Sequence, residues 1–246
     1  MSACSANKIQ IAPTSLEQLS LFKGCGANFM EKLTKSGHEH RHPKGKLLCL
    51  HGDEAEHFFI IKSGWVKLFR ETIDGTQAIT DILSHNSVFG ETAIFENGVY
   101  AYSAEIVKPA IIASYPIDLL KSEIESNHKL AMNMLRSMAH HRRQQDKEIE
   151  HLELQNAPQR IGCFLLKLTP QDAEGPVTIH LPYDKTLIAA RLGMQPETFS
   201  RALGKLKKSA GVTIKGATVE MDSLKQLIQF ACAACSSKFP CDDLTK

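Results

Sequence analysis

The chain has 246 residues, of which 43% are hydrophobic and 23% charged, so we expect a globular protein with a substantial core and not a disordered one. A net charge of +2 indicates no particular partner, and no apolar run approaches the ~20 residues that cross a bilayer. The first twelve residues lack the basic and apolar regions of a secretory signal, so we expect a cytoplasmic protein that uses no membrane.

Short apolar stretches separated by turn residues run from His42 to about Ala113. The Asp74-Gly75 pair is the strongest hairpin signal among them, because both residues tolerate a positive φ. Such short, regular spacing predicts an antiparallel β-sandwich or roll, with unrelated loops in a mixed fold as the alternative. The expected strands are residues 46–51, 57–62, 65–71, 77–84 and about 101–107.

Four segments of this region resemble the β-roll of the CRP/FNR superfamily: PKG at 43–45, HGDEA at 51–55, FFIIKSG at 58–64 and VFGE at 88–91. The resemblance extends from about residue 21 to about residue 222. It implies an α+β chain with a jelly-roll sensor domain of the cyclic-nucleotide-binding type and a winged helix-turn-helix. The expected domains are the sensor at 1–125, a dimerisation helix at 126–156, the winged helix-turn-helix at 157–230 and a cysteine-containing tail at 231–246.

The residues of the effector pocket depart from the pattern of family members that bind cyclic AMP. In those members a Gly-Glu pair is followed by Arg-Ser/Thr-Ala, and the arginine neutralises the cyclic phosphate. This chain keeps Gly90-Glu91 and Ser103-Ala104 but has Tyr102 in place of the arginine, and Gln145-Asp146 replaces the Thr-Ser pair that contacts adenine. We therefore expect no cyclic AMP binding, and we expect Glu91 to hydrogen-bond within its own turn. The pocket residues are Gly90, Glu91, Tyr102 and Ser103.

A long helix is predicted between the two expected domains, because no Gly or Pro interrupts residues 126–156. A helix of this length spans roughly 45 Å, too long to pack throughout on one small β-roll. Its residues at spacings of three and four predict a coiled-coil seam and hence a homodimer. A helix that covers its own domain is the alternative. The seam comprises Ala131, Met134, Met138, His141, Gln145, Ile149 and Leu152.

The last third of the chain has the pattern of a winged helix-turn-helix. Residues 157–169 predict a helix and 177–181 a strand, and they precede a helix at 184–192 with Asp184 as its N-cap. Gly193-Met194-Gln195 predicts the turn, and Pro196 suits the first position of a second helix ending near Lys208. Two short strands at 212–215 and 218–221 follow as the wing. A Gly-containing turn between two helices is typical of DNA-binding proteins.

Charge is concentrated on this motif. The segment from Asp184 to Lys208 holds six basic and two acidic residues, a net charge of +4 on about a tenth of the chain. A basic face of this kind attracts phosphate. We therefore expect double-stranded DNA as a partner, although a solvated helix surface can carry similar charge.

The sequence QPETFSR at 195–201 resembles the recognition helix of the FNR branch, in particular the Dnr-type regulators of nitrogen-oxide respiration. This resemblance implies a TTGAT palindrome read by a homodimer, and RNA polymerase as a further partner. It also implies that Arg201 donates to a guanine, that Glu197 accepts from a cytosine amino group and that Ser200 contacts a thymine or its neighbour. Contacts to phosphates are expected from Lys185, Thr198, Lys205 and Lys207.

The cysteines Cys232, Cys235 and Cys241 are the candidate metal ligands. Thiolates at the spacings x2 and x5 can bind an iron–sulfur cluster or zinc. The spacing resembles the three-cysteine run of oxygen-sensing FNR proteins, where the run lies near the N-terminus instead. Reduced or redox-active thiols are the alternative. A fourth ligand would come from Cys4, Cys25 or Cys163.

Haem is the other candidate cofactor, because the resemblance to Dnr-type proteins implies sensing of nitric oxide through it. None of the histidines is favoured as its ligand over the others. We expect a regulator of redox, oxygen or nitrogen-oxide signals, with a cyclic-nucleotide-dependent regulator as the alternative. The sequence shows none of the hydrolase or nucleotide-binding motifs that an enzyme would need, so a redox enzyme is not favoured. The candidate haem ligands include His38, His40, His42, His140 and His141.

Overall fold

The computed structural model describes residues 16–170, 175–236, 239 and 241. The chain folds into two compact units, a first unit of Met1–Ala139 and a second unit of His140–Lys246. Both helices and antiparallel sheets are present, which confirms the predicted α+β class. Among the described residues, no helix combines the length and the apolar character needed to span a membrane.

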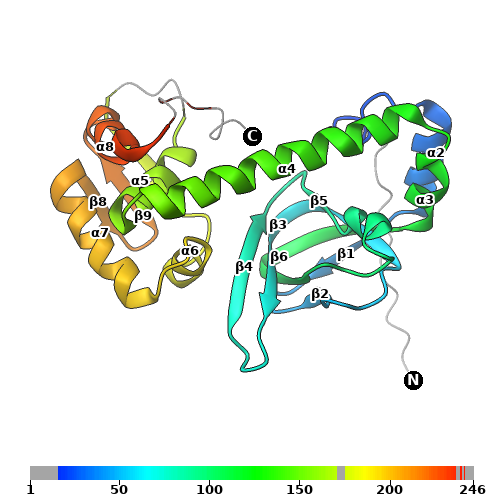
Figure 1. Cartoon of the computed structure of the whole chain (residues 1–246), viewed down its shortest axis with the longest axis horizontal. Coiled ribbons are helices and arrows are strands. Elements are labelled where there is room, and N and C mark those ends of the chain that lie inside the picture. The colour runs from blue at the N-terminus through cyan, green and yellow to red at the C-terminus, as the bar shows by residue number, and fades with distance from the viewer. Residues whose placement is uncertain (1–15, 171–174, 237–238, 240, 242–246) are drawn as a thin grey trace. The chain divides into compact units, whose positions relative to one another are not determined.

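The first unit is an antiparallel β-roll, and the helices α2 (Ala27–Ser36) and α3 (Asp118–Ile124) lie together at one end of it (Figure 1). Its strands pair in the order β1-β6-β3-β4, while β2 pairs with β6 and β5 pairs with β3. The β3–β4 hairpin turns at Gly75, which has a φ of 83° as the Asp-Gly signal predicted. The strands are β1 (His38–His42), β2 (Leu47–Cys49), β3 (His57–Glu71), β4 (Gln77–Leu83), β5 (Val88–Phe89) and β6 (Ser103–Pro116).

The run of apolar residues at the start of β3 is buried on both faces of the strand. Phe58 and Ile60 join a core with the residues of α2 (Ala27–Ser36). Phe59 and Ile61 point the other way, into a second core inside the roll. Alternation of side chains along a strand sends neighbours to opposite faces, so one short run contributes to both cores.

The predicted break at Ser63-Gly64 is wrong, because β3 continues through it as one strand with an irregular register. Gly64 has a φ of 89°, and a Cβ there would lie 2.5 Å from the carbonyl oxygen of Pro109. Glycine therefore permits a close approach between β3 and β6 and does not end the strand. The predicted set also missed β1 and β5, and it ended the last strand nine residues too early.

Helix α4 (His128–Leu154) follows α3 (Asp118–Ile124), and its first turns belong to the first unit. Leu130 and Met134 are buried in the same core as Phe58, with only 2% of Met134 exposed. The predicted seam is therefore wrong at Met134, because this side chain already packs within its own unit.

The second unit contains the elements predicted for a winged helix-turn-helix (Figure 1). Asn156 and Gln159 form a reciprocal capping box at the start of α5, in which each side chain accepts a hydrogen bond from the backbone N–H of the other residue. Helix α5 then buries its apolar residues within the second unit. Strands β7, β9 and β8 form an antiparallel sheet in that order. The elements are α5 (Ala157–Lys167), β7 (Val177–His180), α6 (Lys185–Arg191), α7 (Pro196–Ala210), β8 (Val212–Lys215), β9 (Thr218–Met221), α8 (Leu224–Ala231) and the 3-10 turn η2 (Cys232–Ala234).

Candidate nucleic-acid interface

The turn between α6 and α7 is set by short-range hydrogen bonds. The Asp184 carboxylate accepts from the backbone N–H of Leu187 at 2.8 Å, so Asp184 is the N-cap that the sequence predicted. The backbone N–H of Met194 donates to the carbonyl oxygen of Ala189 at 2.8 Å, and Gly193 takes a φ of 63°. Pro196 then begins α7. These local contacts determine the direction in which α7 leaves the turn.

Helix α7 has one buried face and one exposed face. Phe199, Ala202, Leu206 and Ala210 are buried at helical spacing against the rest of the second unit. Every α7 residue assigned to DNA by the sequence is exposed: Glu197, Thr198, Ser200, Arg201, Lys205 and Lys207. Within the part of the chain that the structure describes, neither Glu197 nor Arg201 forms an ion pair, so both can take an external partner.

The alanines of the two helices differ in burial. Ala190 of α6 is exposed, whereas Ile188 and Ala189 are buried. Ala202 lies on the buried face of α7. An alanine can occupy either face, so its burial follows from neighbouring helices and not from its own hydrophobicity.

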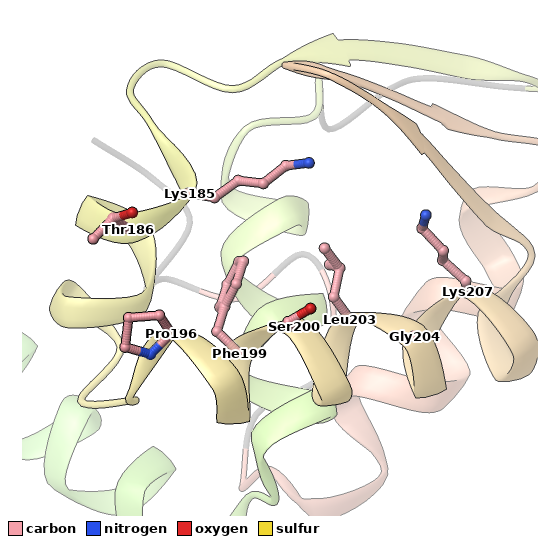
Figure 2. Close-up of a pocket in the computed structure, with 8 residues that line it drawn as sticks. All are labelled: Lys185, Thr186, Pro196, Phe199, Ser200, Leu203, Gly204 and Lys207. Carbon is pink, nitrogen blue, oxygen red and sulfur yellow. The ribbon is translucent and has the colours of Figure 1, made fainter.

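A groove of about 300 Å³ runs along one edge of the exposed face of α7, between this helix and α6. Figure 2 shows Lys185 approaching this groove from α6 and Lys207 from α7, with the side chains of Phe199 and Leu203 pointing from α7 toward the same space. The periodicity of the helix places Thr198 and Lys205 on the opposite edge of the exposed face. Glu197, Ser200 and Arg201, hereafter the central residues, therefore lie between two edges that each carry lysine.

Two further residues of the exposed face were missed by the sequence reasoning. Lys208 lies on the same face as Arg201, two helical turns further along. Gly204 lies between these two side chains and is exposed, with no atom within 4 Å of the position that a Cβ would occupy. The absence of a side chain there leaves room for a partner to approach the backbone. Helical periodicity could have identified both residues.

The end of α4 holds the helix-turn-helix in place within the second unit. Arg191 of α6 contacts both carboxylate oxygens of Glu148, one at 3.1 Å and the other more closely. Leu152 lies against the turn, 3.7 Å from where a Cβ of Gly193 would be. A bidentate guanidinium–carboxylate pair fixes orientation as well as distance. A change at the end of α4 would therefore be transmitted to α6 and to the turn.

The comparisons with known proteins agree with this architecture. Residues 39–127 match the family described as "Cyclic nucleotide-binding domain", and residues 159–230 match "Crp-like helix-turn-helix domain". A solved structure from Ruegeria pomeroyi DSS-3, described as a candidate cyclic nucleotide binding protein, is 30% identical, with a TM-score of 0.62 over 90% of this chain and 99% of that one. The chain belongs to the CRP/FNR superfamily. It is a transcription regulator and not an enzyme.

Curated relatives in the superfamily differ in the signal that their names give. The "CRP-like cAMP-activated global transcriptional regulator" of Mycobacterium tuberculosis is 26% identical over 220 residues, 88% of this chain and 98% of that protein. The "Fumarate and nitrate reduction regulatory protein" of Escherichia coli K12 is 27% identical over 191 residues, 76% of each chain. Identity alone therefore does not assign the signal.

Two residues that the sequence predicts for the effector pocket accept hydrogen bonds from the protein's own backbone. The Tyr102 hydroxyl accepts a hydrogen bond from the backbone N–H of Gly90 at 2.7 Å, and Ser103 Oγ accepts from the backbone N–H of His51 at 3.0 Å. Burial and, next, the nearby Glu91 carboxylate raise the pKa of Tyr102 far above its usual range. The phenol is therefore neutral and cannot replace the missing arginine.

Glu91 is buried at the start of the 3-10 turn η1 (Glu91–Phe95). Burial raises its pKa to about 7, and a hydrogen bond from its own backbone N–H opposes that rise. Its Oε2 atom is buried without a hydrogen-bond partner, so the hydrogen bonding expected within the turn satisfies this carboxyl incompletely.

The candidate metal ligands fall into different parts of the chain. Cys25 is buried in the core of the first unit, whereas Cys163, Cys232, Cys235 and Cys241 belong to the second unit. Cys4 lies outside the described residues. The six cysteines that the structure describes form no disulfide bond with one another.

The candidate haem ligands are also dispersed. His38, His40 and His42 lie on the edge strand β1, and the rings of the last two have centroids 6.2 Å apart. His140 and His141 are exposed on α4. In the residues that are described, no three histidine, cysteine or acidic side chains are already arranged to hold a metal ion.

Proposed function

We propose that this regulator binds an FNR-like TTGAT palindrome as a homodimer, and that it responds to a redox, oxygen or nitrogen-oxide signal instead of cyclic AMP. The observation that carries the DNA-binding part is the exposed set of central residues between the two lysine-bearing edges of α7. Base edges are read by polar side chains in the middle of a recognition helix, and phosphates are contacted at its sides.

Each central residue has a donor or acceptor suited to one base. The Arg201 guanidinium can donate two hydrogen bonds to O6 and N7 of a guanine, and the Glu197 carboxylate can accept from N4 of a cytosine. Ser200 can contact a thymine or its neighbour. Phosphates on both sides of the DNA major groove would be contacted by Lys185, Thr198, Lys205 and Lys207. These contacts would set the register of the helix on DNA.

The proposed dimer uses the part of α4 that is exposed. Met138, His141, Gln145, Ile149 and Leu152 recur at spacings of three and four, and all five are exposed in the single chain. Ile149 is 53% exposed and Leu152 is 55% exposed, although both are large apolar residues. A second copy of the helix would bury this stripe and present two recognition helices about 34–36 Å apart, which matches an inverted repeat. The bound dimer would then contact RNA polymerase.

Replacing Ile149 with lysine is expected to dissociate the dimer and abolish tight binding to an inverted TTGAT repeat, because a charge would enter an apolar seam. Glu153→Lys, which changes an exposed residue close by on the same helix, is the control and should keep both properties. Sedimentation velocity measures the assembly state, and fluorescence anisotropy measures DNA binding. A wild-type protein that is a monomer in both redox states and ignores the repeat at low salt would contradict the proposal.

A cyclic-nucleotide-dependent regulator is the second candidate, favoured by the match of residues 39–127 and by the cAMP-activated relative. Cyclic AMP at millimolar concentration is expected to leave the melting temperature of the first unit unchanged, because the resemblance puts Tyr102 in place of the phosphate-binding arginine and a phenol cannot supply that charge. Differential scanning fluorimetry tests this. A saturable rise in melting temperature, or a gain in affinity for the palindrome, would establish the second candidate instead.

Spectroscopy distinguishes the candidate cofactors through which the signal would act. Haem bound at one of the histidines and an iron–sulfur cluster bound at cysteines absorb differently, and neither absorbs like the bare protein. An absorbance spectrum of protein purified without oxygen therefore assigns the cofactor class. To change DNA binding, the molecule that carries the signal must bind two conformations of the dimer with different affinities.

A further inference from the structure

Cys232 and Cys235 lie one turn apart directly after the last α-helix. Cys232 is the first residue of η2, and Cys235 is the residue that follows this 3-10 turn. A 3-10 helix rises about 2.0 Å per residue, so the Cα atoms of the two cysteines are about 6 Å apart. The Cα atoms of a disulfide bond are usually about 4.4–6.8 Å apart. The backbone of η2 therefore holds these two cysteines at a separation that a disulfide bond can bridge.

The start of this turn is fixed by the packing of α8 on α5. A Cβ on Gly162 would lie 3.0 Å from the Cβ of Ala231, so the two helices approach closely at this glycine. Ala231 is the last residue of α8 and is fully buried. Because Cys232 follows it directly, this contact fixes the backbone from which the Cys232 thiol extends.

The residues after the turn are anchored to the end of α4. The backbone N–H of Ser236 donates to Glu150 Oε1 at 3.0 Å, and Lys147 Nζ donates to Ser236 Oγ at 3.1 Å. The Sγ atom of Cys235 lies 3.9 Å from His151 Nε2, within hydrogen-bonding distance for sulfur. His151 is 9% exposed, whereas Cys235 is partly exposed. A thiol that solvent can reach therefore lies beside a buried imidazole.

We propose that Cys232 and Cys235 are a redox-active pair that hydrogen peroxide converts into a reversible disulfide bond, with Cys235 attacking the peroxide and His151 taking its proton. An imidazole nitrogen at this distance can accept the thiol proton, and the thiolate is the form of cysteine that acts as a nucleophile. Burial, more than any other factor, raises the pKa of Cys232, so this thiol keeps its proton and reacts second.

The proposed oxidation has two steps. In the first step, the Cys235 sulfur attacks one oxygen of the peroxide and the O–O bond breaks. Cys235 becomes a sulfenic acid, and the hydroxide that leaves takes the proton from His151 to form water. In the second step, the Cys232 sulfur attacks the sulfenic sulfur, and the S–O bond breaks to release hydroxide, which leaves as water with the Cys232 proton. The two thiols lose two electrons and two protons, and the peroxide becomes two molecules of water.

Oxidation would change the contact between η2 and the end of α4. The Cys235 sulfur would turn toward Cys232 and would lose the proton that it can share with His151. This end of α4 also contacts the helix-turn-helix, through Glu148 and Arg191. The pair would therefore give the proposed redox response a physical location, and in that role the inference rests on the proposed function.

Treatment of the reduced, oxygen-free protein with hydrogen peroxide, followed by tryptic digestion and mass spectrometry, tests the pair. Trypsin cleaves after Lys225 and Lys238, so both cysteines fall on the peptide 226–238, while Cys163 and Cys241 fall on two other peptides. The peptide 226–238 is expected to lose the mass of two hydrogen atoms and to resist alkylation. Dithiothreitol should restore its original mass, because the disulfide is reversible.

Variants separate the roles of the three residues. Cys232→Ser should stop the reaction after its first step, so that Cys235 accumulates as a sulfenic acid that dimedone traps. His151→Gln should slow the oxidation at least about tenfold at pH 7 and much less at pH 10, where a thiol ionises without a base. Cys163→Ala, which removes another thiol of the second unit, is the matched control and should form the disulfide at the wild-type rate.

The outcomes separate this pair from the proposed function. An unchanged mass of the peptide 226–238, or a disulfide to Cys163 or Cys241, overturns the pair, and equal rates for His151→Gln and the wild type at pH 7 overturn the role of the imidazole. If the oxidised and reduced proteins bind the TTGAT repeat equally well, the pair has no role in the redox response. If the disulfide forms and neither protein binds the repeat, the proposed DNA reading is wrong and the pair is still supported.

Discussion

Replacing Arg201 with alanine is expected to weaken binding to an inverted TTGAT repeat by about 1–3 kcal/mol, while binding to random DNA changes little. Arg201 is exposed at the centre of α7 and has no ion-pair partner among the described residues, so its guanidinium is available to a guanine edge. The variant should fold normally, because no buried group is lost. Anisotropy titrations with both DNA sequences at two salt concentrations measure the difference.

Lys207→Ala is the matched comparison for Arg201→Ala, because it removes one positive charge from the same helix. Lys207 lines the groove at the edge of the exposed face, where a phosphate is the expected partner (Figure 2). Its loss should weaken binding to both DNA sequences about equally and should reduce the salt dependence by about one counterion. An equal loss on both sequences in Arg201→Ala would instead place Arg201 on a phosphate and contradict its assignment.

The winged helix-turn-helix could be predicted almost residue by residue, because its signals are local. Asp184 caps α6, Pro196 begins α7, and Gly216 separates two wing strands whose observed limits equal the predicted ones. Each of these signals depends on the backbone within a few residues. The limits of these helices and strands in the folded second unit therefore agree with the limits that the local signals predicted.

The β-roll was predicted less completely, because its strands are defined by distant partners. Strand β1 consists of polar residues and is a strand only through its pairing with β6, about seventy residues later in the chain. Gly64 has the local character of a turn, yet the approach of Pro109 makes it part of a continuous strand. Met134 likewise suits a dimer seam by spacing, and only the position of α2 shows that it is buried.

The residues of the candidate sites also divide into those that local sequence patterns identify and those that depend on tertiary packing. Helical periodicity identified the exposed residues of α7 without a structure, and it would also have identified Lys208. No local pattern could separate Cys25 from Cys163, because only the structure assigns Cys25 to the core of the first unit and Cys163 to the second unit. The hydrogen bond from the backbone of Gly90 to the Tyr102 hydroxyl also needed the structure, although the absence of the arginine is visible in the sequence.

The buried carboxyl group of Glu91 should make the stability of the first unit depend on pH. Burial raises the pKa of Glu91 from its usual 4.5 to about 7, because the folded protein disfavours the charged form. The stabilising contribution of the protonated group is complete below pH 4.5 and is lost as pH rises from 4.5 through 7. A shift of this size corresponds to about 3 kcal/mol between these limits.

Glu91→Gln is expected to remove this pH dependence and to raise the free energy of unfolding at pH 8 by about 1–3 kcal/mol. The amide carries no charge, although it leaves a polar atom buried where Oε2 has no partner, which offsets part of the gain. Trp65, the only tryptophan, lies in β3, so its fluorescence in urea reports on the first unit.

Glu96→Gln is the control, because Glu96 is exposed and follows η1 directly. It should leave the pH profile of the wild type unchanged. If Glu91→Gln and the wild type lost stability in parallel between pH 5 and pH 8, the charge of Glu91 would have to be satisfied in the folded roll. That result would require a cation or a donor beside Oε2, and it would return this pocket to consideration as a ligand site.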